Sequence, residues 1–318
     1  MANSGLTKMF QQRGVRTLFF GLGAQRSGST WLHRLLSSHP DIYVPEQQKE
    51  LHYWSKWSFP YSETGLNIFE RQRPTGIPRN LLSALLRKDG IQQRRKTIVR
   101  GEFLEAWRVS LSDRDNTHSH YGRVLLSNWS KERVVGEITP LYALIDESGF
   151  REMDAQHSDV RFIYILRDPV DRFKSAISYF AARDLIKAQD RMFDKDGFLT
   201  TGIGKEYLRH SQYERTIQVL EAVIDPAKVH YCFFETMRLE REVERLCEFL
   251  SVDPSGVTLP AKVNASKQLR VPISEELVGE VRQALASTYS FCSAKFEELP
   301  GAWRDNIIKL QSGATAAR

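Results

Sequence analysis

A short loop rich in glycine and serine constrains the fold of this chain more than any other feature. Residues 23–30 read GAQRSGST and have the G-x-x-x-x-G spacing of a phosphate-binding loop. The preceding residues 15–22 form an apolar run, which is typical of a strand buried on both faces. Apolar side chains then repeat at helical spacing within residues 30–38. The order strand, loop, helix is the context in which such a loop can hold a phosphate.

Further apolar segments predict the remaining strands of one sheet: 42–44, 133–136, 160–166 and 229–234. Helical patterns follow two of them, at residues 170–182 and 240–250. Strands that alternate with helices predict an α/β, P-loop-like three-layer sandwich, in which helices flank a central, mostly parallel sheet. We expect a single domain over residues 1–318, because neither a repeat nor a low-complexity linker interrupts it. Residues 1–15 are polar and basic, and we predict a flexible terminus there.

The composition excludes several classes of protein. With 41% hydrophobic and 26% charged residues among 318, the chain has the balance of a soluble globular protein. No apolar run approaches the roughly 18 residues of a transmembrane helix, and we predict no signal peptide. The three cysteines form no C-x-x-C pair, so neither a disulfide framework nor a zinc site is indicated and a cytoplasmic protein is expected. A net charge of +6 favours an anionic partner.

The loop departs from the nucleoside-triphosphatase pattern at one position. That pattern places a lysine after the second glycine, where it reaches the β- and γ-phosphates. Here Ser29 follows Gly28, and the cation within the loop is Arg26. The loop therefore suits a nucleotide with one 5′-phosphate and no metal-bridged triphosphate, or it is a glycine-rich turn that binds nothing.

A second segment at the end of a predicted strand offers matching chemistry. Arg167 follows residues 160–166 directly, and Ser175 comes eight residues later. This spacing can bring a guanidinium and a hydroxyl to one anion at the carboxyl edge of the sheet, where ligands of open α/β sheets bind. Asp168 resembles the magnesium-holding aspartate of a triphosphatase, but before a proline it can equally be a turn residue or a helix cap.

Together these segments resemble the sulfotransferases that use 3′-phosphoadenosine 5′-phosphosulfate (PAPS). The resemblance rests on residues 25–32 (QRSGSTWL) and 166–175 (LRDPVDRFKS), about 140 residues apart. Residues 48–54 (QKELHYW) look like the K/N-E-x-H-aromatic-aromatic segment of the Golgi glycosaminoglycan sulfotransferases, and residues 136–142 (GEITPLY) are similar to their E-K-T-P-x-Y segment. The resemblance covers roughly residues 17–270.

The resemblance implies how the donor is held. The first loop of the family holds the 5′-phosphosulfate and its second motif holds the 3′-phosphate, and a late basic loop closes over the nucleotide. The product is 3′,5′-adenosine bisphosphate (PAP), and no metal is required. The implied donor-binding residues are Gln25, Arg26, Ser27, Gly28, Ser29, Thr30, Trp31, Arg167, Ser175, Lys267 and Arg270. Lys267 and Arg270 can instead belong to a solvated basic loop.

Two residues depart from the family pattern. Arg26 stands where many members have lysine, which keeps the charge but changes its reach and its hydrogen-bonding geometry. Ile138 replaces the lysine of the E-K-T-P segment, so a charge that contacts substrate in some relatives is missing.

Four residues are candidates for the catalytic machinery. Arg26 supplies positive charge to the transferring group. Glu50 matches the base of the carbohydrate sulfotransferases that the chain resembles, and is our first candidate for the base. Glu137 is the second, or a structural carboxylate paired with an arginine. His52 has the ordinary pKa closest to neutrality, but its apolar neighbours also fit a packed histidine.

Residues 54–130 are predicted to be an insertion that binds the acceptor. Their aromatic residues can form a pocket or belong to the core, and they are Trp54, Trp57, Phe59, Tyr61, Phe69, Phe103 and Trp107. A basic cluster between Arg87 and Arg100 can hold an acidic glycan, a carrier protein or an anionic membrane surface, or it is a solvated face.

The sequence favours transfer of a sulfuryl group to a hydroxyl of an oligosaccharide, a glycolipid or another small hydroxylated acceptor. The alternative is a kinase or triphosphatase that uses ATP and magnesium, which the missing lysine disfavours. A nucleic-acid partner is not expected, because basic and aromatic residues do not interleave as they do in RNA-binding motifs.

Overall fold

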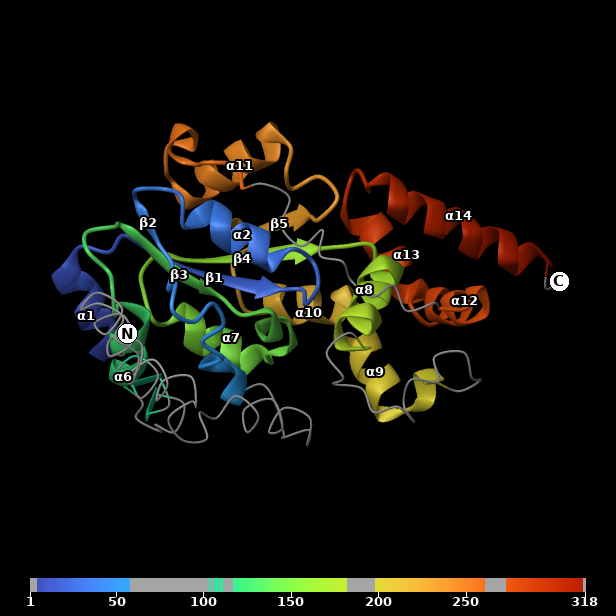
Figure 1. Cartoon of the computed structure of the whole chain (residues 1–318), viewed down its shortest axis with the longest axis horizontal. Coiled ribbons are helices and arrows are strands. Elements are labelled where there is room, and N and C mark those ends of the chain that lie inside the picture. Colours follow the sequence, from blue (N-terminus) through green and yellow to red (C-terminus); the bar gives the residue numbers. More distant parts are fainter. Residues whose placement is uncertain are drawn as a thin grey trace, which may run out of the picture.

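The computed structural model describes residues 5–57, 103, 106–107, 109–110, 117–181, 198–260 and 273–316. Its centre is a parallel five-stranded sheet with the strand order β2-β3-β1-β4-β5 (Figure 1). The strands are β1 (Thr17–Gly23), β2 (Ile42–Tyr43), β3 (Val134–Ile138), β4 (Val160–Leu166) and β5 (Val229–Phe233). Each of them coincides with an apolar segment of the sequence, so the predicted sheet is confirmed.

Helices cover both faces of the sheet. Figure 1 shows α2 (Ser29–Leu36) and α11 (Glu240–Leu250) above it, and α7 (Glu147–Asp154) and α10 (Tyr213–Glu221) below. Alternate residues of each strand serve the two layers. Phe19 packs in the cluster that contains α2 and α11, whereas its neighbour Phe20 packs in the larger cluster with α7 and α10. The predicted three-layer α/β sandwich is therefore confirmed.

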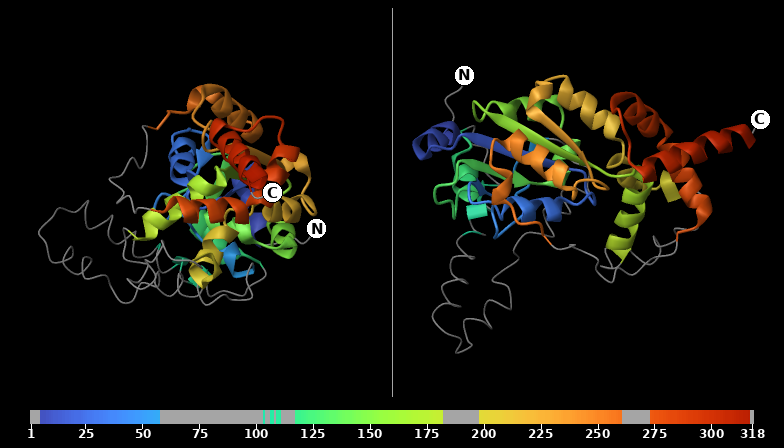
Figure 2. Two further views of the ribbon diagram at one scale, coloured as in Figure 1. Left: turned by 90° about the vertical axis from the view of Figure 1, so that its right-hand side faces the viewer. Right: turned by 90° about the horizontal axis from the view of Figure 1, so that it is seen from above.

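The remaining helices surround one end of the sheet and its flanks. They are α6 (Ser119–Leu125), α8 (Pro169–Ala181), α9 (Gly202–Arg209), α12 (Glu275–Ala284), α13 (Ala286–Lys295) and α14 (Gly301–Ala316), with 3₁₀ turns η1 (Trp54–Trp57), η2 (Pro140–Leu144), η4 (Phe198–Thr200), η5 (Pro226–Lys228) and η6 (Pro254–Gly256). Figure 2 shows α14 leading away from the sheet, so that the two termini lie at opposite ends of the molecule.

The strand order fixes where a ligand can bind. From β1 at the centre, the chain builds β2 and β3 on one side and then crosses to β4 and β5 on the other. The switch lies between β1 and β4, which pair as far as Gly23 and Tyr164. In open α/β sheets, ligands bind outside the carboxyl ends of the strands at such a switch. The loops after β1 and β4 are the two that carry the predicted phosphate motifs.

The prediction of a flexible terminus over residues 1–15 is wrong for residues 5–13. Gly5–Arg13 forms helix α1, which contacts α6. Leu6 and Phe10 lie four residues apart, on one face of that helix, and both are fully buried in the main core. The polar composition of the segment hid this short amphipathic pattern.

The predicted insertion falls largely outside the described residues, including the basic cluster from Arg87 to Arg100 and the aromatic residues Phe59, Tyr61 and Phe69. Trp54, Phe103 and Trp107 are described, and all three are buried in the main hydrophobic core. For these three, the core alternative is confirmed. Among the described helices, none is long and apolar enough to cross a membrane.

Candidate active site

The loop after β1 is shaped by glycine at two points. Gly28 is the N-cap of α2 and has a φ of 93°, in the left-handed region that favours glycine. A Cβ atom at this position would collide with Met237 Cε and would lie 2.9 Å from Phe234 Cδ2. No side chain caps α2, and the N–H groups at its start, those of Ser29 and Thr30, point where an anion can bind, whereas the Trp31 N–H donates to the Gly28 backbone oxygen. The backbone of the loop can therefore accept an anion at the start of α2.

The two predicted phosphate motifs meet at this loop. Arg26 Nε donates to Ser175 Oγ over 3.4 Å, and its guanidinium lies 4.1 Å from the ring centroid of Tyr179 on α8. Arg167 Nη1 donates to the backbone oxygen of Arg26 over 2.9 Å. Segments about 140 residues apart thus meet at the loop, with Ser175 on the Arg26 side chain and Arg167 on the Arg26 backbone.

Lys49 joins this loop to the candidate base. Lys49 Nζ donates both to Ser29 Oγ, at 2.9 Å, and to Glu50 Oε1, at 3.0 Å. His52 Nε2 lies 3.5 Å from the other carboxylate oxygen of Glu50, whose side chain is 34% exposed. Burial raises the pKa of Glu50, but the hydrogen bond with His52 and the charge of Lys49 outweigh it and hold that pKa at about 2. Glu50 is therefore ionised at neutral pH.

Lys49 also supplies a cation to the loop, which lacks the lysine of a triphosphatase. Ser29 occupies the position where a triphosphatase has its lysine, and the amine of Lys49 lies on its hydroxyl. The cation comes from a different segment of the chain. Sequence reasoning assigned no role to Lys49, although it lies in the QKELHYW segment that supports the family resemblance.

Glu137 has a different environment. Its carboxylate is fully buried and accepts four hydrogen bonds, from Tyr121 Oη at 2.6 Å, Tyr142 Oη at 2.9 Å, Thr139 Oγ1 at 2.9 Å and the Leu51 N–H at 3.2 Å. Burial raises the pKa of Glu137, while these donors lower it. Its partners are hydroxyl and amide groups where an arginine was expected. This carboxylate fastens the Glu50 segment to β3.

His52 is held beside Glu50 by its backbone. Its φ of 56° is unusual for a residue other than glycine, and its N–H donates to Thr139 Oγ1 over 3.4 Å. The ring is buried. His52 is therefore both a packed histidine and a neighbour of Glu50.

Asp168 is a helix cap. Its Oδ1 accepts the N–H of Asp171 at 2.9 Å in the first turn of α8, and its Oδ2 accepts bonds from Tyr289 Oη at 2.8 Å and Asn306 Nδ2 at 3.1 Å. Burial raises the pKa of Asp168 to about 6. Because both oxygens are engaged by the protein, the magnesium-holding alternative loses its support.

A buried arginine lies behind the loop. Arg172 is fully buried and donates to Ser211 Oγ, to the Tyr207 backbone oxygen and, over 3.5 Å, to the Gln25 backbone oxygen. Burial lowers the pKa of Arg172 to about 10. It fastens the start of the loop to α8 and α9.

Of the remaining predicted donor-binding residues, Ser27 and Trp31 are buried beside Gly28, and Thr30 lies in the first turn of α2. Lys267 and Arg270 lie outside the described residues. Phe234, Met237 and Arg238, in the turn between β5 and α11, also border the loop. No motif of the sequence pointed to this turn.

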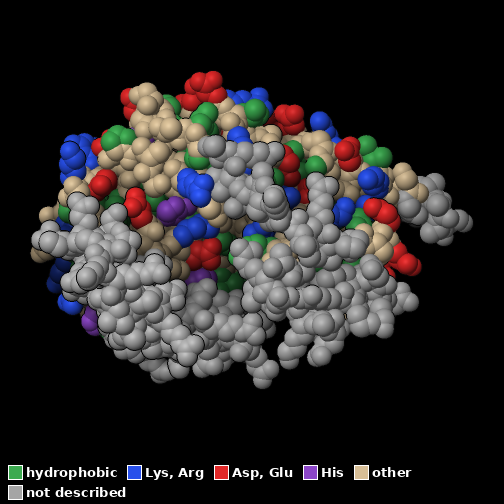
Figure 3. Space-filling view, in the orientation of Figure 1, with side chains coloured by type: hydrophobic (Ala, Val, Ile, Leu, Met, Phe, Trp, Pro, Cys, Tyr) green, Lys and Arg blue, Asp and Glu red, His purple; other side chains and the backbone are tan. Residues whose placement is uncertain are grey.

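Basic, acidic and histidine side chains gather at the middle of one face of the molecule, near the strand ends seen in Figure 1 (Figure 3). In the described residues, no group of three or more His, Cys, Asp or Glu could hold a metal ion.

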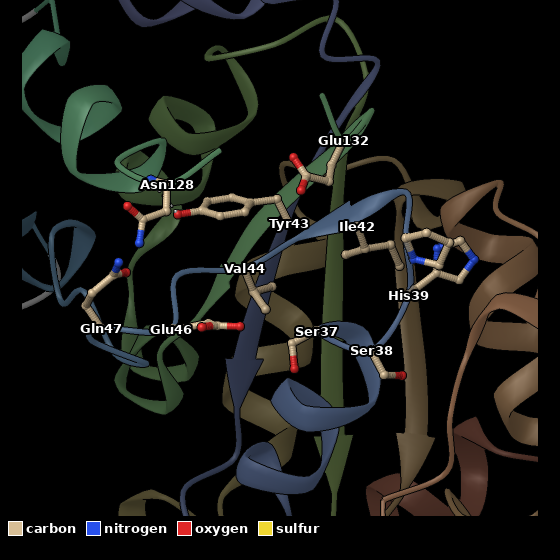
Figure 4. A pocket seen from close by; sticks show the side chains of 11 residues that line it. Ser37, Ser38, His39, Ile42, Tyr43, Val44, Glu46, Gln47, Asn128 and Glu132 are labelled. Carbon is tan, nitrogen blue, oxygen red and sulfur yellow. Dashed lines mark hydrogen bonds between the residues drawn. The ribbon is translucent and has the colours of Figure 1, made fainter. Parts of the chain in front are cut away.

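A pocket of about 360 Å³ lies beside the edge strand β2 (Figure 4). Its lining includes the carboxylates of Glu46 and Glu132 and the amides of Gln47 and Asn128, but no lysine or arginine. In Figure 4 the side chains of Gln47 and Asn128 point toward one another. An acidic lining does not suit a phosphate, so this pocket is separate from the loop site in its chemistry.

Comparison with known proteins decides the family. A profile described as "Sulfotransferase family" matches residues 19–255, which include both phosphate motifs. The chain belongs to the sulfotransferase family. It is thus a transferase of the sulfotransferase class, as the sequence motifs predicted.

A solved structure of another sulfotransferase shares the fold, and a second is similar more distantly. A sulfotransferase from Alicyclobacillus acidocaldarius is 23% identical and superposes with a TM-score of 0.61, over 91% of this chain and 99% of that one. The sulfotransferase domain of the Synechococcus PCC 7002 olefin synthase is 17% identical, with a TM-score of 0.47 over 95% and 96% of the two chains. No curated protein matches the chain.

Proposed function

We propose that this sulfotransferase moves a sulfuryl group from PAPS to a hydroxyl of an oligosaccharide, a glycolipid or another small hydroxylated acceptor. PAP is released, and the carboxylate of Glu50 acts as the base without a metal. The observation that carries the proposal is Lys49, which bonds both to the loop at Ser29 and to Glu50. The donor loop and the candidate base thereby share one hydrogen-bonded network.

The residues of the loop fit a nucleotide with phosphates at both ends. Ser27 Oγ is buried, and among the described residues it has no hydrogen-bond partner. Arg167 forms no ion pair with a carboxylate in the described part of the chain. The 5′ end would be held by Arg26 and the N–H groups of Gly28 to Thr30, and the 3′-phosphate by Arg167 and Ser175.

PAPS supplies a sulfonate and a good leaving phosphate when it is bound. The chain has to stabilise the charge on both and to take a proton from the acceptor. Arg26 and Lys49 place cations at the loop. Glu50 is ionised, so its carboxylate can accept the hydroxyl proton directly, and His52 steadies the second carboxylate oxygen. Glu137 is a poorer candidate for the base, because its carboxylate already accepts four hydrogen bonds.

The acceptor class rests on the likeness of the QKELHYW and GEITPLY segments to carbohydrate sulfotransferases. Lys49 supplies a second cation to the loop that carries Arg26. All three cysteines are free and buried, which fits a reducing compartment, and we place the enzyme in the cytoplasm.

The test is an acceptor screen with labelled PAPS, read by mass spectrometry, on the unaltered chain and on Glu50→Gln. We expect Glu50→Gln to lower turnover at least 100-fold while PAP binding survives, because only the base is lost. Glu46→Gln makes the same change at an exposed position nearby and should leave turnover unaltered. Near-normal turnover by Glu50→Gln would remove Glu50 from the mechanism.

A further inference from the structure

The turn between β5 and α11 forms a wall of the donor site. The N–H of Phe234 donates to the Leu166 backbone oxygen over 2.7 Å, which fixes the turn at the carboxyl end of β4. Met237 packs so closely on Gly28 that only a hydrogen fits between them. Arg238 is the next residue, so its position relative to the loop is set by backbone contacts.

Two arginines share the Phe234 ring. The guanidinium carbon of Arg167 lies 4.5 Å from the ring centroid and that of Arg238 lies 4.9 Å from it. Arg238 also lies 5.7 Å from the ring of Trp31. Glu235, the acidic residue beside them, has one carboxylate oxygen 2.8 Å from the Asp168 N–H and the other 3.4 Å from Trp303 Nε1.

The described part of the chain neutralises this pair only in part, because Glu235 interacts electrostatically with Arg167 while its two oxygens bond to Asp168 and Trp303. Neither guanidinium forms an ion pair with a carboxylate there. Arg238 Nε and Trp31 Nε1 are also buried without a hydrogen-bond partner among the described residues, as is Ser27 Oγ. Buried donors without partners and two neighbouring like charges are both unfavourable. A bound anion would relieve both.

We propose that Arg238 is a second guanidinium for the 3′-phosphate of the donor, beside Arg167. This inference rests on the proposed function. A phosphate monoester carries a charge close to −2 at neutral pH and matches two guanidiniums, whereas the 5′ end already has Arg26, Lys49 and the start of α2. Arg238 thereby sets the preference for a nucleotide that carries a 3′-phosphate over one that lacks it.

The test is calorimetric titration with PAP and with 5′-AMP, which differ only in the 3′-phosphate. We expect Arg238→Ala to weaken PAP binding about 10- to 100-fold and 5′-AMP binding less than about threefold. Arg238→Lys keeps the charge but loses the planar fork, and should recover part of the preference. Arg241→Ala is the matched control. It removes the same charge three residues along the chain, where the Arg241 side chain is 66% exposed.

Equal loss of both nucleotides in Arg238→Ala, or unchanged PAP binding, would overturn the inference. Thermal unfolding of each variant identifies a folding defect. If Arg238→Ala does not fold, Arg238→Lys replaces it: an unchanged preference for PAP over 5′-AMP in that variant would show that the guanidinium does not bind the 3′-phosphate. Failure of the unaltered chain to bind either nucleotide would instead refute the proposed function.

Discussion

The carboxylate of Glu50 lies between Lys49 and His52, and both of these partners lower its pKa. Lys49 lies 3.0 Å from one oxygen and His52 lies 3.5 Å from the other. Lys49 has a second bond, to Ser29 of the loop, so the same amine serves both the base and the donor site. Removing the amine should therefore affect both the rate and its pH dependence.

We predict that Lys49→Met lowers kcat by about 100- to 1,000-fold, because a charge at the transferring group is lost. It should also move the acid limb of the pH–rate profile to higher pH. Lys49 helps to hold the Glu50 pKa at about 2, so without it that pKa rises toward its ordinary value of 4.5, and protonation begins at a higher pH. Steady-state rates from about pH 3 to 8 measure this, with Lys49→Arg as the control that keeps the charge. An acid limb in the same place in both variants would contradict the pairing.

Single residues differ in how far the sequence predicts them. That Arg26, Arg167 and Ser175 meet could be predicted, because each stands at a fixed place in a motif that follows a strand, and parallel strands end at one edge. Arg238 could not be predicted, because its contact with Phe234 and Trp31 depends on how the β5–α11 turn packs. Lys49 is intermediate, since its segment was noted but its bond to Ser29 is a tertiary contact.

The loop between β1 and α2 packs directly against the β5–α11 turn. This close packing requires glycine at position 28, because no side chain fits between the two segments. Gly28 combines a φ of 93° with the close approach of Met237 and Phe234. Gly14 has a similar φ of 66° but no atom within 4 Å of an added Cβ. An alanine at position 14 would therefore meet backbone strain alone, whereas an alanine at position 28 would meet both backbone strain and a steric collision.

We predict that Gly28→Ala lowers PAP affinity at least tenfold, because the loop has to move away from the β5–α11 turn. Gly14→Ala carries only the left-handed strain, about 1–2 kcal/mol, and should lower the melting temperature without changing PAP affinity. Calorimetry and thermal unfolding of both variants measure this. Normal PAP affinity in Gly28→Ala would show that the close packing is not needed for binding.

Whole strands and helices could be predicted from the sequence where their apolar pattern is strong. The strands could be predicted because both faces are buried, which leaves continuous apolar runs such as FIYIL in β4. Helix α11 was predicted at its observed bounds, since its apolar residues recur along one face. Helix α1 was missed because Leu6 and Phe10 alone carry its buried face.

Across the molecule, one buried carboxylate connects the active-site edge of the sheet to the C-terminal helices. Asp168 follows β4 and caps α8, and it accepts hydrogen bonds from Tyr289 on α13 and Asn306 on α14. Trp303 of α14 is fully buried, and its ring packs on that of Tyr289. The C-terminal helices thus support the segment that carries Arg167.

We predict that this carboxylate makes stability fall as pH rises. Its ordinary pKa is 3.8 and its pKa in the folded chain is about 6. Between these values the unfolded chain has lost the proton and the folded chain keeps it, so the free energy of unfolding decreases with pH, by at most about 3 kcal/mol. In Asp168→Asn this contribution is absent. Urea denaturation of both proteins from pH 4 to 7 measures the difference, and parallel curves would contradict the raised pKa.

The excess positive charge of the chain is explained in part at the scale of the whole molecule. Arg26, Arg167, Arg238 and Lys49 gather around one loop, where a nucleotide with phosphates at both ends can bind. The most direct test of the account is a calorimetric competition between PAP and ATP with magnesium for the unaltered chain. The account predicts that PAP binds more tightly and is not displaced by ATP with magnesium. Tighter binding of ATP with magnesium would contradict it.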